Sequence, residues 1–371
     1  MSEITERPGF AGLLSRPLIG EAGRRRLEGF LIPLIALLAG LALFGVFIAL
    51  NGKSPAEFYQ LVYRGGFGTW FSLQNTMTRA APLLLTALCV ALPAQLGLVV
   101  IGGEGAFVLG GLAAAVVGPL FGFAPGSLAI LMMALAGLCA GGLWIGLVGA
   151  MRHYRGINET ISSLLMAYIA IALMNHFVEG PLKDPASLNK PSTVPLPDDM
   201  RIGEIPGMDV HWGFALGILA CLAAGFVLSR TTFGFAARIA GGNARAAAVQ
   251  GLPVGWLILA FTAAAGAAAG LAGMIQVAAV QGSANASLAA GYGYTGILIA
   301  FLARQNPIAI IPMALLIGGI DAAGGFIQRR MDLPDATVLV LQGILFVSIL
   351  VSETLSGRLL PSRNAKAGAA K

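Results

Sequence analysis

The chain alternates between long apolar runs and short polar segments. A membrane-spanning helix needs about 20 mainly apolar residues, or about 17 to 25 when it is tilted. Runs of this kind lie near residues 30–50, 75–93, 104–121, 126–149, 160–178, 211–229, 253–278, 291–303, 306–323 and 336–353. The pattern therefore predicts an all-α, polytopic membrane protein with about ten transmembrane helices.

The composition agrees with a chain whose main partner is the lipid bilayer. Of the 371 residues, 57% are hydrophobic and 11% are charged, whereas soluble domains carry about 25% charged residues. The net charge of +6 comes from basic residues scattered over short loops, which does not indicate a nucleic-acid partner. Small residues four apart, as in Gly137 and Gly141, Gly142 and Gly146, and Gly266 and Gly270, favour close packing of helices within the chain.

The distribution of basic residues predicts the orientation. With a cytoplasmic N-terminus and ten spans, 15 of the 23 lysines and arginines face the cytoplasm, as the positive-inside rule requires. The predicted organisation is a cytoplasmic tail at 1–29, a transmembrane domain at 30–353 and a second cytoplasmic tail at 354–371. A long polar loop at 179–210 then lies outside the cell, and a polar loop at 230–252 lies inside.

Two segments look like interrupted helices. Residues 95–107 place Glu104 between glycines, and residues 291–303 are a short run that begins Gly-Tyr-Gly-Tyr. Short or glycine-interrupted segments in corresponding places of two halves are typical of inverted-repeat transporters. We therefore expect helices two to five and seven to ten to form two halves of opposite orientation.

Two interpretations of Glu104 remain open. An ionisable group at membrane depth commonly faces a cavity or pairs with another group, so it could carry a proton or touch the substrate. Alternatively, its carboxylate could be hydrogen-bonded to a neighbouring loop or helix N-terminus.

Nothing in the sequence indicates a catalytic, metal or cofactor site. The Gly-Lys-Ser at 52–54 lacks the earlier glycine of a phosphate loop, and the Gly-Tyr-Gly-Tyr-Thr-Gly at 291–296 does not belong to a βαβ unit. The three histidines are far apart, without metal-ligand spacing, and no serine or cysteine has the flanking residues of a nucleophile. We expect a protein that is not an enzyme and binds no metal or cofactor.

A polar island interrupts the apolar sequence at 235–254. Residues 236–240 and 244–249 are alanine-rich and favour helix, Gly241 and Gly242 would permit a bend, and Pro253 can start the next helix. Arg238 and Arg245 could offer charge to a polar partner. A solvated cytoplasmic loop would also explain the arginines, but not the helical run.

Several segments resemble one transporter family. The sequence RGINETISSLLMAYIA at 155–170 is similar to the Gly-x-Asn-Glu-x-Ile segment of the permease subunits of bacterial ABC importers for simple sugars and nucleosides, a superfamily that also includes ribose and branched-chain amino acid permeases. The segments VVIGGEGAFVLGG and GYGYTGILIAFLARQNPIAII, together with ARIAGGNARAAAVQGL, resemble further motifs of the same family. The resemblance covers about residues 75 to 350.

The resemblance implies a role for each of these segments. The cytoplasmic loop would form a coupling helix that contacts the ATPase subunit through Arg238, Gly241, Gly242, Asn243, Arg245 and Gly251. The substrate pathway would run along Gly103, Glu104, Tyr292, Tyr294 and Thr295, and the family motif at the fifth span would be Gly156, Asn158 and Glu159. The implied partners are ATPase subunits, a second permease subunit that forms a homodimer or heterodimer, and an extracytoplasmic substrate-binding protein that could dock on loop 179–210, unless that loop is disordered.

The resemblance also implies the location and the cargo. It places the chain in the bacterial plasma (inner) membrane, with multiple spans and both termini cytoplasmic. Nucleosides or simple sugars are the expected cargo. The alternatives are a branched-chain amino acid ABC permease and an ion-coupled secondary transporter.

Overall fold

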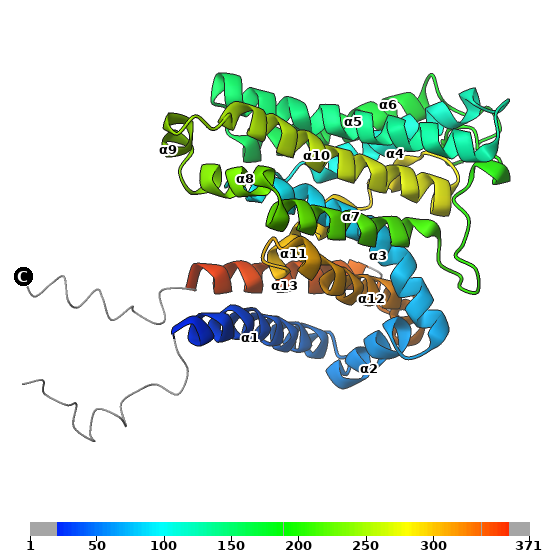
Figure 1. The fold of residues 1–371 in the computed structure, drawn as a ribbon. Helices are drawn as coiled ribbons and strands as arrows, with labels where there is room; N and C mark the ends of the chain where they lie inside the picture. The colour runs from blue at the N-terminus through cyan, green and yellow to red at the C-terminus, as the bar shows by residue number, and fades with distance from the viewer. Residues whose placement is uncertain (1–20, 188, 335, 356–371) are drawn as a thin grey trace, which may run out of the picture. The chain divides into compact units, whose positions relative to one another are not determined.

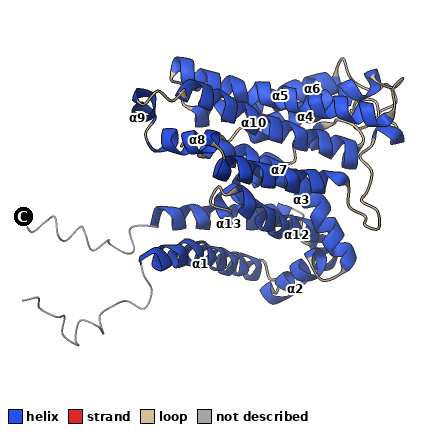
Figure 2. Cartoon of the chain, viewed as in Figure 1, coloured by secondary structure: helices blue, strands red, loops and turns tan. Residues whose placement is uncertain are grey.

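The protein is helical throughout the part of the chain that its computed structural model describes, residues 21–187, 189–334 and 336–355. Figure 2 shows helices joined by loops, and these residues contain no strand, only isolated bridges between Ser192 and Asn285 and between Glu204 and His211. The predicted all-α class is confirmed.

The described helices follow one another with short connections, except for one long loop before α7 (Figure 1). They are α1 (Glu21–Leu50), α2 (Pro55–Gly66), α3 (Trp70–Ala94), α4 (Gly103–Leu120), α5 (Gly126–Arg155), α6 (Glu159–Glu179), the 3-10 helix η2 (Asp198–Met200), α7 (Trp212–Arg230), α8 (Thr232–Gly242), α9 (Ala244–Val249), α10 (Val254–Ile275), the π-helix η3 (Gln276–Gln281), the 3-10 helix η4 (Ala286–Leu288), α11 (Tyr292–Leu302), α12 (Pro307–Met331) and α13 (Ala336–Leu355).

The number of full spans is smaller than the ten that the apolar runs predict. Seven described helices are long and apolar enough to cross a membrane, or eight if the bent pair Leu34–Leu50 and Pro55–Gly66 counts as one span. Helix α11 has 11 residues, which at about 1.5 Å per residue is far short of a hydrocarbon core of about 30 Å. The prediction was wrong in number because an apolar run does not reveal how much of it is helical.

The chain divides into two compact units. The first comprises residues 1–45 and 343–371, and within its described part Gly40 on α1 packs against Leu345 and Ser348 on α13. The second comprises residues 46–342 and contains every site discussed below. The tails predicted at 1–29 and 354–371 lie mostly outside the described residues, although α1 already begins at Glu21.

Glycine contacts hold α4, α5 and α10 together. A methyl group at Gly141 on α5 would overlap the carbonyl oxygen of Gly266 on α10, and one at Gly270 would overlap the carbonyl oxygen of Gly137. On the other side of α10, a methyl group at Gly110 of α4 would collide with the backbone of Gly270. Figure 1 shows α5 and α10 running side by side. The predicted close packing through small residues is therefore confirmed, and it is intramolecular.

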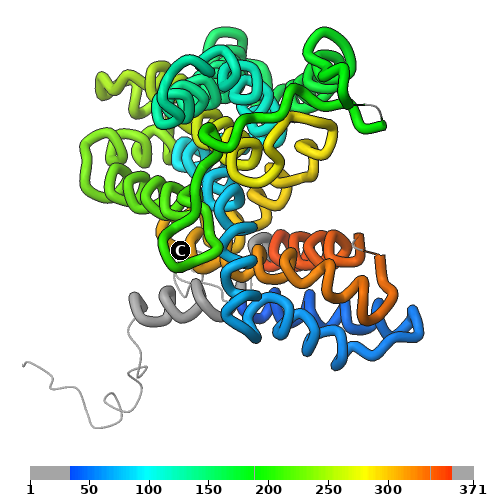
Figure 3. Tube along the Cα trace, turned by 90° about the vertical axis from the view of Figure 1, so that its right-hand side faces the viewer, coloured from blue at the N-terminus to red at the C-terminus, as the bar shows by residue number. Residues whose placement is uncertain are grey.

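The long loop before α7 is ordered against the segment that precedes α11. The backbone N–H groups of Thr193, Leu196 and Ile202 donate to carbonyl oxygens of Ala284, Gly282 and Ala278 at 2.9, 2.7 and 3.1 Å. Figure 3 shows the loop lying across this segment. Of the two expectations for loop 179–210, a docking surface or a disordered loop, the described residues contradict disorder.

The glycine contacts between α5 and α10 predict opposite results for two glycine-to-alanine substitutions on α5. Gly141→Ala should destabilise the protein by about 1 to 3 kcal/mol, because overpacking forces α5 and α10 apart. Gly146→Ala should be neutral or slightly stabilising, because its methyl group would lie at an ordinary 3.5 Å from Ala263 and alanine favours helix. Thermal unfolding of the purified variants in detergent measures both effects. Equal stability of the two variants would contradict the close packing of α5 on α10 through these glycines.

Candidate functional site

Two helices of the second unit begin directly after non-helical segments. Helix α4 starts at Gly103 after the non-helical residues 95–102, and α11 starts at Tyr292 after residues 282–291, whose only helix is the short η4. Both predicted helix interruptions are confirmed. The N-terminal ends of these two helices meet each other, although they are far apart in sequence.

Glu104 joins the two helix ends. Its carboxylate accepts hydrogen bonds from the backbone N–H of Gly291 at 2.8 Å and of Gly293 at 2.5 Å. A Cβ atom at Gly293 would lie 2.5 Å from the Cα of Glu104 and 2.8 Å from the carbonyl carbon of Gly103, so only glycine permits this approach. The residue is 1% exposed. The geometry matches the second interpretation of Glu104, a carboxylate that satisfies the unpaired N–H groups at a helix N-terminus.

The predicted pathway residues on α11 fall into two groups. Tyr292 stacks on Phe107 of α4 with ring centroids 5.3 Å apart, and Thr295 hydrogen-bonds through its hydroxyl to the side-chain oxygen of Gln342 at 3.2 Å. Both line the same pocket. Tyr294 is exposed and does not line it.

This pocket has a volume of about 230 Å³ and contains an ion pair. Its lining residues come from α3, the end of the 282–291 segment, α11, α12 and the start of α13: Arg79, Leu83, Ala290, Tyr292, Thr295, Asp321, Ala336, Val338 and Leu339. The Nη1 atom of Arg79 lies 3.0 Å from Oδ2 of Asp321. Sequence reasoning missed this pair, because it assigned no role to either residue. An acidic residue inside an apolar run was the available signal.

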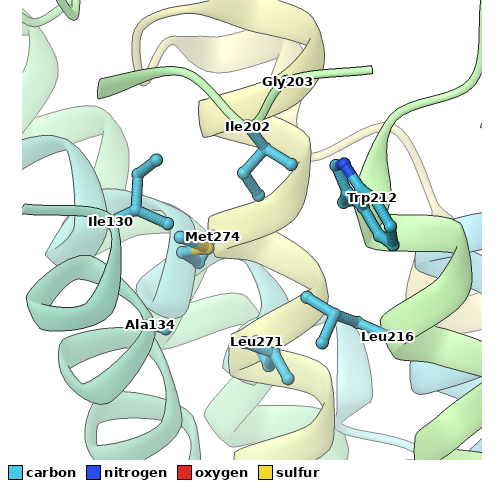
Figure 4. Close-up of a pocket in the computed structure, with 8 residues that line it drawn as sticks. All are labelled: Ile130, Ala134, Ile202, Gly203, Trp212, Leu216, Leu271 and Met274. Carbon is cyan, nitrogen blue, oxygen red and sulfur yellow. The ribbon is translucent and has the colours of Figure 1, made fainter. Parts of the chain in front are cut away.

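A second pocket, of about 240 Å³, lies between α5, α7 and α10 and is almost wholly apolar (Figure 4). It is lined by Ile130, Ala134, Ile202, Gly203, Trp212, Leu216, Leu271 and Met274. The indole of Trp212 is its only side chain with a hydrogen-bonding group. A hydroxylated molecule would find few partners here, so the pocket beside α11 is the better candidate for polar cargo.

The family motif at the fifth predicted span forms the turn between α5 and α6. Gly156 ends α5 in the left-handed conformation with a φ of +66°, which favours glycine. Asn158 caps α6 by accepting two backbone N–H groups of its first turn at 2.9 and 3.1 Å. Glu159, which is largely buried, pairs with Arg152 at 3.3 Å.

The first residues of α6 also hold the non-helical segment 95–102, which leads to α4. Glu159 accepts the N–H of Val99 at 3.4 Å, and the hydroxyl of Thr160 donates to the carbonyl of Val99 at 2.9 Å. Ser163 accepts the N–H of Ile101 at 3.1 Å. Three side chains of α6 thus form hydrogen bonds with backbone N–H and C=O groups that have no partner in a helix or sheet. Irregular backbone in an apolar environment requires such partners.

The residues of the polar island form two helices, and the break between these helices does not lie at Gly241 and Gly242. Gly241 and Gly242 both belong to α8, and the helix breaks at Asn243, whose side chain caps α9 by accepting the N–H of Ala246 at 3.0 Å. Gly251, with a φ of +85°, follows α9. The predicted glycine hinge was therefore wrong: the break falls at Asn243, a residue type that favours the N-cap position, and Gly241, within α8, packs against Gln95.

The two arginines of the island have different surroundings. The guanidinium of Arg238 donates to the carbonyl of Leu228 at the end of α7, so this residue closes a helix end within the chain. Arg245 is exposed on α9, and Val249 at its end is 90% exposed, while Ala247 is buried underneath. The exposed face of α9 is therefore the part available to another protein.

Helix α8 packs directly on the start of the interrupted segment. A methyl group at Gly241 would overlap the carbonyl oxygen of Gln95, and Leu96 and Leu98 share an apolar cluster with the buried face of α8. The side-chain amide of Gln95 donates to the carbonyl of Gln305, between α11 and α12, at 3.2 Å. Gln95, which sequence reasoning also missed, thus links α8 to the far end of α11.

Comparison with known proteins agrees with these features. The chain is 30% identical over 332 residues to the glucose ABC transporter permease protein TsgB13 of Haloferax volcanii, which covers 86% of this chain and 87% of that protein. It is 27% identical to the guanosine ABC transporter permease protein NupP of Bacillus subtilis, over 93% and 99% of the two chains. It is 24% identical to the nucleoside ABC transporter permease protein NupB of Lactococcus lactis, over 85% and 89%.

A family model with the description "Branched-chain amino acid transport system / permease component" matches residues 72–350, three quarters of the chain and nearly all of its second unit. The matched range includes both helix interruptions, the Glu104 junction, and helices α8 and α9. The chain belongs to this family of membrane transport permeases.

Proposed function

We propose that this chain is the membrane-spanning permease subunit of an ABC importer that carries a nucleoside or a simple sugar. The observation that carries the proposal is the similarity to NupP and TsgB13 over 99% and 87% of their lengths. Guanosine and glucose, which the two names mention, are both uncharged and rich in hydroxyl groups. Membership of an ABC permease family implies ATPase subunits and a substrate-binding protein in general.

The proposed assembly uses the two ends of the second unit differently. Helix α9 would face the cytoplasm and contact the ATPase, and the loop between α6 and α7 would face outward and receive the binding protein. Both chain termini would be cytoplasmic, in a bacterial plasma membrane, which agrees with the excess of basic residues on that side. A second permease subunit, identical or related, would complete the pathway. The chain itself would hydrolyse no ATP and would not act as an enzyme.

The first prediction tests the source of energy and the cargo together. The complex of this chain with its ATPase and partner permease, reconstituted in liposomes with the binding protein, should accumulate radiolabelled guanosine or glucose only when ATP is supplied. A protonophore should leave uptake unchanged. Uptake driven by an ion gradient without the ATPase would reject the proposal, and accumulation of leucine alone would favour the branched-chain amino acid alternative.

Glu104 is proposed to hold the pathway together rather than to carry protons. Its carboxylate is already the acceptor for two N–H groups at the start of α11. Leaving a buried N–H group unpaired costs about 1 to 3 kcal/mol. Gly103 and Glu104 would contribute to the pathway mainly by fixing where α11 begins.

Glu104→Ala should therefore lower the thermal stability of the complex and reduce transport, because both N–H groups lose their acceptor. Glu104→Gln should keep a substantial part of both, because its amide oxygen still accepts one N–H. Thermal unfolding and uptake are measured on the same preparations. Full loss of uptake in Glu104→Gln with unchanged stability would instead indicate a proton or substrate role.

Helix α9 is proposed to dock into the ATPase through its exposed face. Val249 presents an apolar side chain at the end of the helix, Arg245 presents a charge, and Asn243 fixes where the helix starts. Arg238 would support this surface indirectly, because its guanidinium is occupied by the carbonyl of Leu228. The core of a protein interface is more apolar than the rest of the surface, and arginine is enriched in interfaces.

Val249→Asp should weaken binding of the ATPase about tenfold or more, equivalent to about 1.4 kcal/mol, because a charge replaces an apolar contact. Val194→Asp is the matched control: it changes an exposed valine in the loop before α7, which should not affect the ATPase. Co-purification of the ATPase is compared in correctly inserted variants. Equal binding by both variants would reject α9 as the docking helix.

A further inference from the structure

The pocket beside α11 contains a pair of opposite charges that the family motifs do not include. Arg79 lies on α3 and Asp321 on α12, with their charged atoms 3.0 Å apart and their side chains 42% and 27% exposed. Both line the same cavity as Tyr292 and Thr295. The pair is therefore accessible from the cavity.

We propose that the Arg79–Asp321 pair is a binding subsite for two neighbouring hydroxyl groups of the cargo, such as those of a ribose or a pyranose ring. The inference rests on the proposed function and names the part of the cargo that this pocket recognises.

The chemistry of the pair suits a diol. A guanidinium only donates hydrogen bonds and an ionised carboxylate only accepts them, while each hydroxyl group does both. Adjacent hydroxyls can therefore donate to Asp321 and accept from Arg79 while the ion pair stays intact. Hydrogen bonds to charged groups are roughly twice as strong as neutral ones. The pair is neutral as a whole, so binding of uncharged cargo adds no unbalanced charge.

The dimensions of the pocket suit one ring. Its volume of about 230 Å³ is below the range of about 300 to 1,000 Å³ typical of sites for drug-sized ligands. Tyr292 contributes an aromatic ring and Leu83, Val338 and Leu339 contribute apolar walls. A combination of apolar surface with a few polar groups that fix orientation is typical of small-molecule sites.

A purely structural role explains the pair less well. Next to it, α3 and α12 already pack closely, because a Cβ atom at Gly318 would lie 3.1 to 3.2 Å from backbone and side-chain atoms of Ala80. A partly exposed ion pair contributes only about 0 to 1 kcal/mol to stability. The helices therefore do not need the pair in order to approach each other.

The position of the pair places the cargo next to the Glu104 junction. Tyr292 is the first residue of α11, and Gly293, the next residue, touches the backbone of Gly103 and Glu104. A ring held between Arg79, Asp321 and Tyr292 would lie against the helix end that the Glu104 junction fixes.

The test measures equilibrium binding of tritiated guanosine, 2′,3′-dideoxyguanosine and radiolabelled glucose to the purified permease–ATPase complex. The substrate-binding protein is left out because it would impose its own selectivity. The wild type should bind guanosine about tenfold or more tightly than the dideoxy analogue. Asp321→Asn should lose most of this preference, while Asp332→Asn, an exposed aspartate at the end of the same helix, should retain it.

Arg79→Lys provides a second variant that keeps the charge and loses the planar fork of donors. It should weaken guanosine binding several-fold and reduce the preference over the dideoxy analogue, so the test does not depend on the folding of Asp321→Asn. Thermal unfolding of each variant is measured alongside.

The outcomes separate the inference from the proposed function. Wild-type selectivity in both Asp321→Asn and Arg79→Lys would overturn the diol subsite, as would a wild-type complex that transports guanosine or glucose but binds neither saturably. A wild-type complex that transports neither molecule would overturn the proposed function itself.

Discussion

The carboxylate of Glu104 is the interaction on which the rest of the second unit depends. Helices α4 and α11 both begin among apolar helices, where unpaired backbone N–H groups have no water to bind. Glu104 lies in the first turn of one helix and accepts two N–H groups from the start of the other. The absence of a Cβ atom at Gly293 lets the two backbones touch. With this contact in place, Tyr292 can stack on Phe107 and the polar pocket acquires its α11 wall.

The segment before α4 connects this junction to helices α8 and α9. From α6, Glu159, Thr160 and Ser163 hold residues 99–101 by hydrogen bonds. From α8, Gly241 packs on Gln95, which in turn donates to Gln305 at the other end of α11. A displacement of α8 and α9 would therefore act on the segment before α4 and on the loop after α11. The contacts form one continuous path from α8 to the two helix ends that meet at Glu104.

The sequence predicted the elements whose signals are local and missed those that depend on tertiary contacts. Apolar runs and glycines located the helices and both interruptions, because span length and backbone freedom are properties of short segments. The count of full spans failed in part at α11, whose preceding residues are held by the long loop before α7 rather than in a helix. The glycine hinge failed because Gly241 serves close packing. Asp321 and Gln95 acquire their partners from helices far away in sequence, which no local pattern could show.

The partners of the ionisable groups favour an energy source outside this chain. Glu104 is satisfied as an acceptor of two N–H groups, Glu159 pairs with Arg152, and Asp321 pairs with Arg79. An ion-coupled carrier needs a group that gains and loses its ion during each cycle, and each of these three groups already has a partner within the chain. An ATPase that drove the cycle through α9, as proposed, would ask nothing of Glu104 and Glu159 beyond holding the helices in place.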